Sequence, residues 1–439
     1  MKKKMMIAGL VLAGMISVTS VAVSQLTRQS KDDLYSQIEL FSYVLTTVQS
    51  DYVDEKTARD LIYGSLKGML SNLDPHSQFM DPDEYKELKT ETEGKFGGLG
   101  IEISIKDNLL TIVTPIEDTP AWKAGLKSGD KIVKIEGKVT RDINLSDAVK
   151  QLRGKPGTDV TITILREGKG GEETQVFDVK ITREIIQIRD VKFPQILQDH
   201  IGYIRLTEFR ENSAKEFHKA VESLKEQGAD ALIVDLRNNP GGLLNVAIDI
   251  TEEFLPEGQT VVSTKGRHES QNSVSVSDNK NSVTWPMVVL INEGSASGSE
   301  IFAGALKDNK RAVIVGMKSF GKGSVQSVIP MPDGSGLRLT TSKYFTPSGV
   351  SIHEIGIQPD VEVDFVAPKK DESTDKDKTK SDKKSEHVTE VFEHLDEEDP
   401  LDEVVTPEAE ARERLLKDNQ VQAAMSVLKG IRVYQGFGK

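Results

Sequence analysis

The sequence contains no cysteine, which excludes disulfide bonds, thiolate zinc sites and a cysteine nucleophile. Its seven histidines form no His-Glu-x-x-His pattern, so the helical zinc-protease motif is absent as well. Acidic residues outnumber basic residues, which gives a net charge of −13. Because binding to nucleic acid needs a basic surface, we expect no nucleic-acid partner.

One long apolar run stands at the N-terminus. Three lysines precede about nineteen mainly apolar or small residues, Met5–Val23. Such a run can cross a thin hydrocarbon core and also matches a long signal-peptide core, with a small-residue cleavage site near Ser24. The lysines should stay cytoplasmic. We therefore predict that residues 1–24 are a membrane anchor or a signal peptide. The remainder would be extracytoplasmic, periplasmic or on the outer face of the cytoplasmic membrane, either anchored or secreted.

The length of 439 residues suggests two or three domains, and 37% apolar with 28% charged residues suits a globular chain with solvated segments. Within residues 25–93, apolar positions recur at helical spacing from Leu34 to Leu70. This pattern predicts two amphipathic helices, broken near residues 51–56. A leading helix pair of this kind is compatible with a homodimer.

The C-terminal part has a different composition. Residues 367–402 are dominated by Lys, Asp, Glu and Ser and hold few large apolar side chains, so we predict a disordered linker. Residues 403–439 are predicted to be a helical tail, with a helix over 406–428.

Residues 94–184 alternate short strands with turn signals. They contain GLGI, PAWKAGLKSGDKIVKIEG and LRGKPGTDVTITILR, and this order resembles a PDZ domain. Glycines in such a loop expose backbone N–H groups to a terminal carboxylate, and an open strand edge pairs with an extended peptide. The residues predicted to bind a substrate tail are Gly98, Leu99, Gly100 and Ile101.

Residues 185–366, with contributions from 72–93, form the predicted core domain. Apolar strand patterns such as ADALIVDLR alternate with helical patterns such as SAKEFHKAVESLKEQG. This order predicts an α/β fold with mostly parallel strand pairing. Residues 267–283 are polar and are predicted to form a loop.

Two residues of this domain could do chemistry together. Ser297 lies in a run of small residues at the start of a predicted helix, where backbone N–H groups and the helix dipole favour developing negative charge. A serine hydroxyl becomes a useful nucleophile only when a base takes its proton. The alternative is that the serines of this run merely cap the helix.

Lys322 lies between two glycines and is the candidate base. Its pKa would have to fall from about 10.4 to about 7–8, which requires an enclosed site. Gln326 follows four residues later and could orient either partner. Otherwise Lys322 is a solvated turn residue. Gly316–Lys322 also matches part of a nucleotide-binding P-loop, but Gly323 and a strand-like continuation replace the required Ser or Thr and helix.

A second glycine turn supports acyl transfer. DLRNNPGG follows a buried strand and opens a helix, so that Gly241 and Gly242 could turn N–H groups toward an oxyanion. The N–H of Gly298 would be another donor.

In this order DLRNNPGGLL, NEGSASGSEIFAGALKDN, RAVIVG and SFGKGSVQ resemble the carboxyl-terminal processing peptidases, or tail-specific proteases, over roughly residues 34–365. The resemblance implies an α/β serine protease core with an inserted β-rich PDZ domain and N-terminal helices. It also implies a Ser297-Lys322-Gln326 triad. Gly298 departs from the alanine common in the family.

Further expectations follow from this resemblance. The chain would cleave proteins near accessible C-termini, with no metal or cofactor. PDZ and protease would move together, with Arg153 as a candidate for the coupling. Two other functions stay open: an inactive membrane-tethered PDZ adaptor, and a Ser-His-Asp hydrolase that uses His218 or His353.

Overall fold

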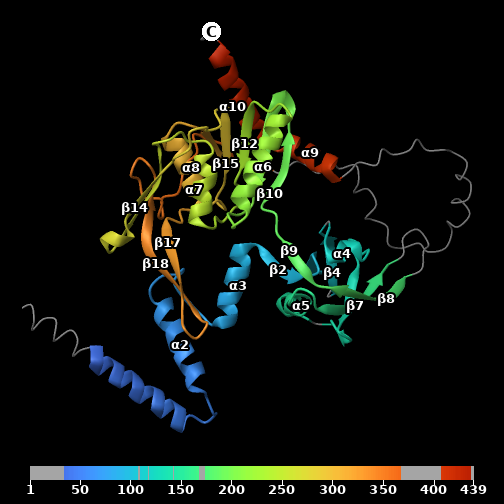
Figure 1. Cartoon of the computed structure of the whole chain (residues 1–439), viewed down its shortest axis with the longest axis vertical. Coiled ribbons are helices and arrows are strands. Elements are labelled where there is room, and N and C mark those ends of the chain that lie inside the picture. Colours follow the sequence, from blue (N-terminus) through green and yellow to red (C-terminus); the bar gives the residue numbers. More distant parts are fainter. Residues whose placement is uncertain are drawn as a thin grey trace, which may run out of the picture. The chain divides into compact units, whose positions relative to one another are not determined.

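The computed structural model describes residues 34–106, 109–116, 118–141, 143–167, 174–366 and 407–436. The predicted anchor or signal peptide (1–24) and linker (367–402) lie outside these residues. No helix in the described ranges is long and apolar enough to cross a membrane. The chain forms two compact units, of which the first comprises Met1–Tyr85 with Gln326–Thr340 and the second Lys86–Val325 with Thr341–Lys439 (Figure 1).

The first unit begins with the two predicted helices. One spans residues 34–51 and the other is α2 (Ala58–Ser71). Thr57 caps α2, since its side chain accepts a hydrogen bond from the N–H of Asp60. Strand β1 (Gln78–Met80) then pairs antiparallel with the first residues of β18 (Gly336–Phe345).

The second unit contains a small β-rich fold. Its elements are α3 (Pro82–Glu93, which begins in the first unit), β2 (Lys95–Gly98), β3 (Ile101–Lys106), β4 (Leu109–Pro115), α4 (Pro120–Lys123), β5 (Lys131–Ile135), β6 (Lys138–Val139), α5 (Leu145–Leu152), β7 (Asp159–Arg166), β8 (Gln175–Thr182) and β9 (Glu184–Gln187). The sheet order is β3-β4-β5-β7-β8, so β3 is an edge strand. Val160, Ile162 and Ile164 alternate inward along β7 and are fully buried, which gives this fold its own core.

A larger α/β fold follows. Its elements are β10 (Val191–Ile196), η1 (Gln198–His200), β11 (Ile201–Leu206), α6 (Ser213–Glu226), β12 (Ala231–Asp235), α7 (Leu244–Glu252), β15 (Met287–Ile291), α8 (Gly298–Asp308), β16 (Val313–Gly316) and β19 (Val361–Glu362). The sheet order is β10-β11-β12-β15-β16-β19. All neighbours from β11 to β19 are parallel, and only β10 is antiparallel. The prediction of a multidomain α/β fold is confirmed.

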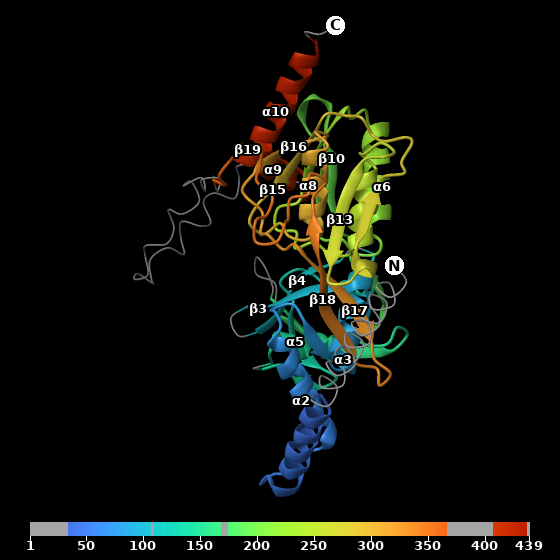
Figure 2. The same ribbon diagram turned by 90° about the vertical axis from the view of Figure 1, so that its left-hand side faces the viewer.

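Helices cover both faces of this sheet (Figure 2). Leu232 and Val234 of β12 pack with α6, α7 and α8, while Ile233 points to the opposite face. That face is covered by α10 (Asn419–Gly436), which follows α9 (Pro407–Lys417). The single helix predicted over 406–428 is therefore two helices, interrupted at Asp418, and the second continues to residue 436.

A second sheet within this fold is antiparallel. β13 (Thr260–Gly266) pairs with β14 (Ser273–Val276) and with the last residues of β18. The remaining elements are η2 (Glu269–Gln271) and β17 (Ser324–Pro330), which pairs with β18. The prediction of a loop over 267–283 was wrong for β14, because its Ser-Val alternation forms a short, mostly exposed edge strand that carries little apolar signal.

Candidate active site

Ser297 lies at the junction between β15 and α8. It immediately precedes α8, and its φ of 52° is unusual for a residue with a side chain. The residue is only 8% exposed. The turn therefore holds a nearly buried serine in a strained conformation at the N-terminus of a helix.

The neighbouring serines hold this turn in place. Ser295 Oγ donates to the Leu236 carbonyl at 2.8 Å, and Ser299 Oγ donates to the Asn239 carbonyl at 2.9 Å. The N–H of Ala296 also donates to Asn239. Thus Ser295 and Ser299 attach the turn of Ser297 to residues 236–239, which lead into the glycine turn.

Glu300 joins Ser297 to the lysine loop, and the sequence predictions missed it. One oxygen, Oε2, accepts from the N–H of Ser297 at 2.8 Å and from the N–H of Lys322 at 2.9 Å. The other oxygen accepts from Ser319 Oγ and from the N–H of Gly321. Glu300 is fully buried, and burial raises its pKa, while these four hydrogen bonds oppose the rise.

The lysine loop is tightly packed. Gly321 has a φ of +94°, and a Cβ on Gly323 would lie 2.2 Å from the backbone nitrogen of His353. Lys322 itself is half-buried, and β17 follows it without a helix. Gln326 is half-buried on β17 and is the first residue of that strand assigned to the first unit.

The backbone conformation at two of the predicted oxyanion positions requires glycine. Gly241 and Gly242 have φ values of +102° and +145°, and a Cβ on Gly241 would lie 2.7 Å from both Ser297 Cβ and the nitrogen of Gly298. Gly241 thus lies directly against the serine turn. Its N–H donates to Asn239 Oδ1 at 2.9 Å, so an oxyanion would have to compete with that bond.

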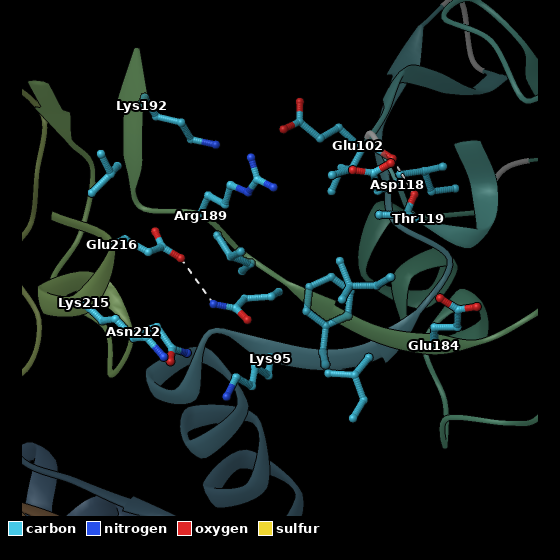
Figure 3. A pocket seen from close by; sticks show the side chains of 18 of the residues that line it. Lys95, Glu102, Asp118, Thr119, Glu184, Arg189, Lys192, Asn212, Lys215 and Glu216 are labelled. Atoms are coloured by element: carbon cyan, nitrogen blue, oxygen red, sulfur yellow. Dashed lines mark hydrogen bonds between the residues drawn. The ribbon is translucent and has the colours of Figure 1, made fainter. Parts of the chain in front are cut away.

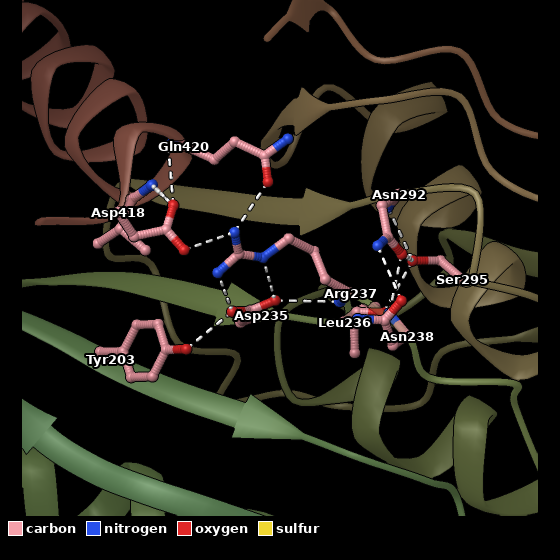
Figure 4. Close-up of polar contacts among 10 residues, drawn as sticks. Tyr203, Asp235, Leu236, Arg237, Asn238, Asn292, Ser295, Asp418 and Gln420 are labelled. Atoms are coloured by element: carbon pink, nitrogen blue, oxygen red, sulfur yellow. Dashed lines mark hydrogen bonds and ion pairs between the residues drawn. The ribbon is translucent and has the colours of Figure 1, made fainter. Parts of the chain in front are cut away.

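Arg237 anchors the base of the glycine turn, and it was also missed (Figure 4). Its Nε and Nη2 donate to the carboxylate of fully buried Asp235, which also accepts from Tyr203 Oη at 2.7 Å. Its Nη1 donates to Asp418 Oδ2 and Gln420 Oε1, both at 2.8 Å. These carboxylates hold the pKa of Arg237 above its usual value despite burial.

The PDZ-like residues lie around the start of β3. Gly98 pairs with Glu184, and Leu99 is buried. Gly100 has a φ of +78°, and a Cβ there would lie 2.3 Å from the Cβ of Thr119. Ile101 is the first residue of the edge strand β3. Only glycine therefore fits at the centre of this loop.

A hollow of about 1260 Å³ adjoins this loop (Figure 3). It is lined on one side by the β2–β9 ribbon and the β3 region, including Ile101, and on the other by β10 and α6. Arg153 also lines it, and its guanidinium lies 4.2 Å from the centre of the Phe96 ring. Neither Ser297 nor Lys322 is among the lining residues.

The histidines that might serve a different hydrolase are placed differently. His218 is exposed and contacts Glu253, with Nδ1 3.3 Å from Oε1. His353 packs against the lysine loop through its backbone, and its neighbour Glu354 donates its N–H to the Gly321 carbonyl. Within the described ranges, no cluster of acidic or histidine side chains is arranged to hold a metal ion.

Comparison with known proteins defines the class. Residues 200–363 match the model of peptidase family S41, and residues 111–166 match that of the PDZ domain. Together with the buried serine at a helix start, these matches make the chain a serine peptidase that carries a PDZ domain.

The relatives narrow this class further. The chain is 43% identical over 371 residues to a carboxy-terminal-processing protease of Bartonella bacilliformis, covering 83% of each chain. It is 36% identical over 345 residues to the carboxy-terminal processing protease CtpA of Bacillus subtilis, covering 78% of this chain and 72% of the relative. A solved photosystem II D1 C-terminal processing protease is 30% identical, with a TM-score of 0.44, and the match covers 74% of this chain and 92% of that one. The chain belongs to the carboxyl-terminal-processing proteases of family S41.

Proposed function

We propose that this peptidase cleaves proteins near their C-termini with Ser297 as the nucleophile and Lys322 as the general base. The observation that carries the proposal is the shared acceptor on Glu300. The backbone nitrogens of Ser297 and Lys322 both lie within 2.9 Å of the same carboxylate oxygen. A single buried side chain therefore fixes the start of the nucleophile helix and the base loop against each other.

The proposed reaction uses groups of the chain together with one water molecule. Neutral Lys322 takes the proton of Ser297 Oγ as the oxygen attacks the peptide carbonyl, and the lysine then gives that proton to the leaving amine. Water hydrolyses the acyl-enzyme in the second step. The N–H groups of Gly242 and Gly298 stabilise the oxyanion, joined by Gly241 when its bond to Asn239 is exchanged. Gln326 orients the lysine.

A direct test compares cleavage of casein by wild type, Ser297→Ala and Lys322→Ala. Lys318→Ala is the matched control, because Lys318 is an exposed lysine of the same loop. We expect both active-site variants to lose roughly 10³-fold or more in kcat, and Lys318→Ala to retain activity. Wild-type activity in Lys322→Ala would exclude the lysine as base. Loss in His353→Ala with intact folding would favour the histidine hydrolase, and no cleavage by wild type would favour the adaptor.

We further propose that the PDZ domain binds substrate tails along β3. The support is an edge strand that begins directly after a glycine loop. A peptide substrate with a free C-terminal carboxylate should have a several-fold lower KM than the same peptide with a C-terminal amide. Equal KM values would contradict carboxylate recognition. Arg153, stacked on Phe96 beside this loop, is the candidate that couples tail binding to cleavage.

The site of action is proposed from the N-terminal sequence. The basic start and apolar run of residues 1–24 would direct the chain to the outer side of the cytoplasmic membrane. Protease added to intact spheroplasts should digest the enzyme, and deletion of residues 2–24 should leave it protected inside. Protection of the full chain would contradict this location.

A further inference from the structure

The C-terminal helices lie beyond the residues that match the peptidase family model, which end at 363. Even so, α10 is part of the core of the α/β fold. Val421, Ala424 and Leu428 are fully buried and belong to the same apolar cluster as Tyr203 and the inner strands of the sheet. Because one side of α10 is buried over successive turns, the helix packs as part of the core and not as a loosely attached surface helix.

The start of α10 brings two acceptors to a buried arginine. Asp418 precedes α10, and its Oδ1 accepts from the N–H groups of Gln420 and Val421, which caps the helix. Its Oδ2 and the Gln420 Oε1 both accept from Nη1 of Arg237. The side chains of Arg237 and Asp418 are only 11% and 14% exposed, so water screens this pair weakly. The amide nitrogen of Gln420, Nε2, donates to the Val363 carbonyl at 2.7 Å.

Arg237 is also where the glycine turn begins. The next residue, Asn238, has a φ of +59° and exchanges hydrogen bonds with Asn292 through its N–H and its side-chain oxygen. Asn292 lies at the end of β15, directly before the serine turn. The contacts in Figure 4 thus run from α10 through Arg237 to the two turns that would hold the oxyanion and the nucleophile.

We infer that Asp418 and Gln420 are positioning residues for catalysis, which hold the Asn238–Gly242 turn against Ser297 by fixing Arg237. This inference rests on the proposed role of Ser297. The guanidinium has acceptors on both sides, with Asp235 on the strand side and α10 on the other. Without the acceptors of Asp418 and Gln420, the buried guanidinium of Arg237 would be held by Asp235 alone and could shift toward it. A shift of about 1 Å in the oxyanion donors is enough to lower catalysis.

The test compares Asp418→Asn with Asp230→Asn. Asp230 is the matched control because it forms an ion pair with Arg432 near the other end of α10, far along the helix from Arg237. We expect Asp418→Asn to lower kcat about tenfold or more, with KM changed less than about twofold. Asp230→Asn should leave kcat unchanged. The fraction of folded enzyme is measured by unfolding in urea, so that kcat is expressed per folded molecule.

A second variant tests the charge itself. Asp418→Glu keeps a carboxylate at this position beside Nη1 of Arg237 and should retain more of the wild-type kcat than Asp418→Asn. Equal kcat values per folded molecule in Asp418→Asn and Asp230→Asn would overturn the positioning role. Cleavage by Ser297→Ala would instead overturn the proposed nucleophile, so the two failures are distinguishable.

Discussion

Glu300 joins the serine turn to the lysine loop of the candidate site. Its two oxygens accept four hydrogen bonds, from Ser297, Ser319, Gly321 and Lys322. In Glu300→Gln one oxygen becomes an NH₂ group, which must face at least one N–H donor. We expect a loss of about 1–3 kcal/mol in unfolding free energy and at least a tenfold fall in kcat.

Unfolding in urea and steady-state cleavage measure these two effects. Glu293→Gln is the matched control, because Glu293 is an exposed glutamate of the same β15–α8 connection. Wild-type kcat in Glu300→Gln, with Ser297 still required, would show that the shared carboxylate does not set the active geometry.

Glu253 predicts a pH dependence of stability. Burial, with a further contribution from Glu222, raises the pKa of Glu253 to about 8. Protonated His218 would lower that pKa, but its side chain is 64% exposed and its charge is screened. The folded chain holds the proton of Glu253 more tightly than the unfolded chain. The contribution of Glu253 to the unfolding free energy is therefore fully present below pH 4.5 and is lost as pH rises through about 8.

The variant Glu253→Gln removes this titration. Relative to wild type it should gain about 4 kcal/mol in unfolding free energy between pH 5 and pH 8.5. Urea titrations across this range measure the difference. Parallel pH curves for the two proteins would show that Glu253 titrates alike in the folded and unfolded states.

The difference between the residues that could be predicted and those that could not has a physical origin. Ser297 and Lys322 became candidates because each lies in a short run of small residues, which is a local pattern in the sequence. Glu300 was missed although Ser297-Gly298-Ser299-Glu300 matches the Ser-x-x-Glu capping box, which was the available signal. The Arg237–Asp418 contact joins residues 181 positions apart, and no local pattern reports such a pairing.

At the scale of elements, the start of β3 gives a prediction with a close control. Gly100 and Gly125 have nearly equal φ values, +78° and +75°, but only Gly100 has neighbours that a Cβ would strike. Gly125→Ala should therefore cost about 1 kcal/mol from the backbone conformation alone. Gly100→Ala should cost at least about 2 kcal/mol more, because the added methyl group would strike Thr119. Thr119 is held in place by hydrogen bonds from its hydroxyl group to the carbonyls of Gly100 and Ile116.

The fluorescence of Trp122 on α4 can report unfolding of this fold. The sequence has one other tryptophan, Trp285, which is replaced by phenylalanine so that the signal comes from Trp122 alone. Urea unfolding of both glycine variants in that background measures the difference. Equal losses in Gly100→Ala and Gly125→Ala would mean that the loop relaxes around the added methyl group.

The parallel strands were predictable because βα alternation and short apolar runs are local signals. The antiparallel pairing of β13 with β14 and β18 was not, since strand partners distant in sequence leave no periodic trace. The tail helix was expected, but its place on the sheet depends on buried side chains that only the folded chain reveals.

At the scale of the whole molecule, the first helix predicts association. Ile38, Phe41 and Val44 lie on one helical face and are each about half exposed. We propose that this face pairs with a second copy of the chain, because an exposed apolar stripe favours burial. Replacement of all three by serine should convert a dimer into a monomer in light scattering coupled to size exclusion.

The control for this prediction is Val274→Ser with Val276→Ser, since both valines are exposed on β14 in a different part of the chain. This pair of changes should leave the mass unaltered. A monomeric wild type, or a dimer that survives the helix substitutions, would contradict pairing through the first helix.

The central claim concerns how the serine is activated, and the most direct measurement is the rate at which a fluorophosphonate labels the protein as a function of pH. Peptide mapping should place the label on Ser297. The rate should rise with a pKa of about 7–8, and Lys322→Ala should lower it at least about 100-fold at neutral pH while Lys318→Ala does not. Labelling of another serine, or an unchanged rate in Lys322→Ala, would contradict a Ser297–Lys322 active site.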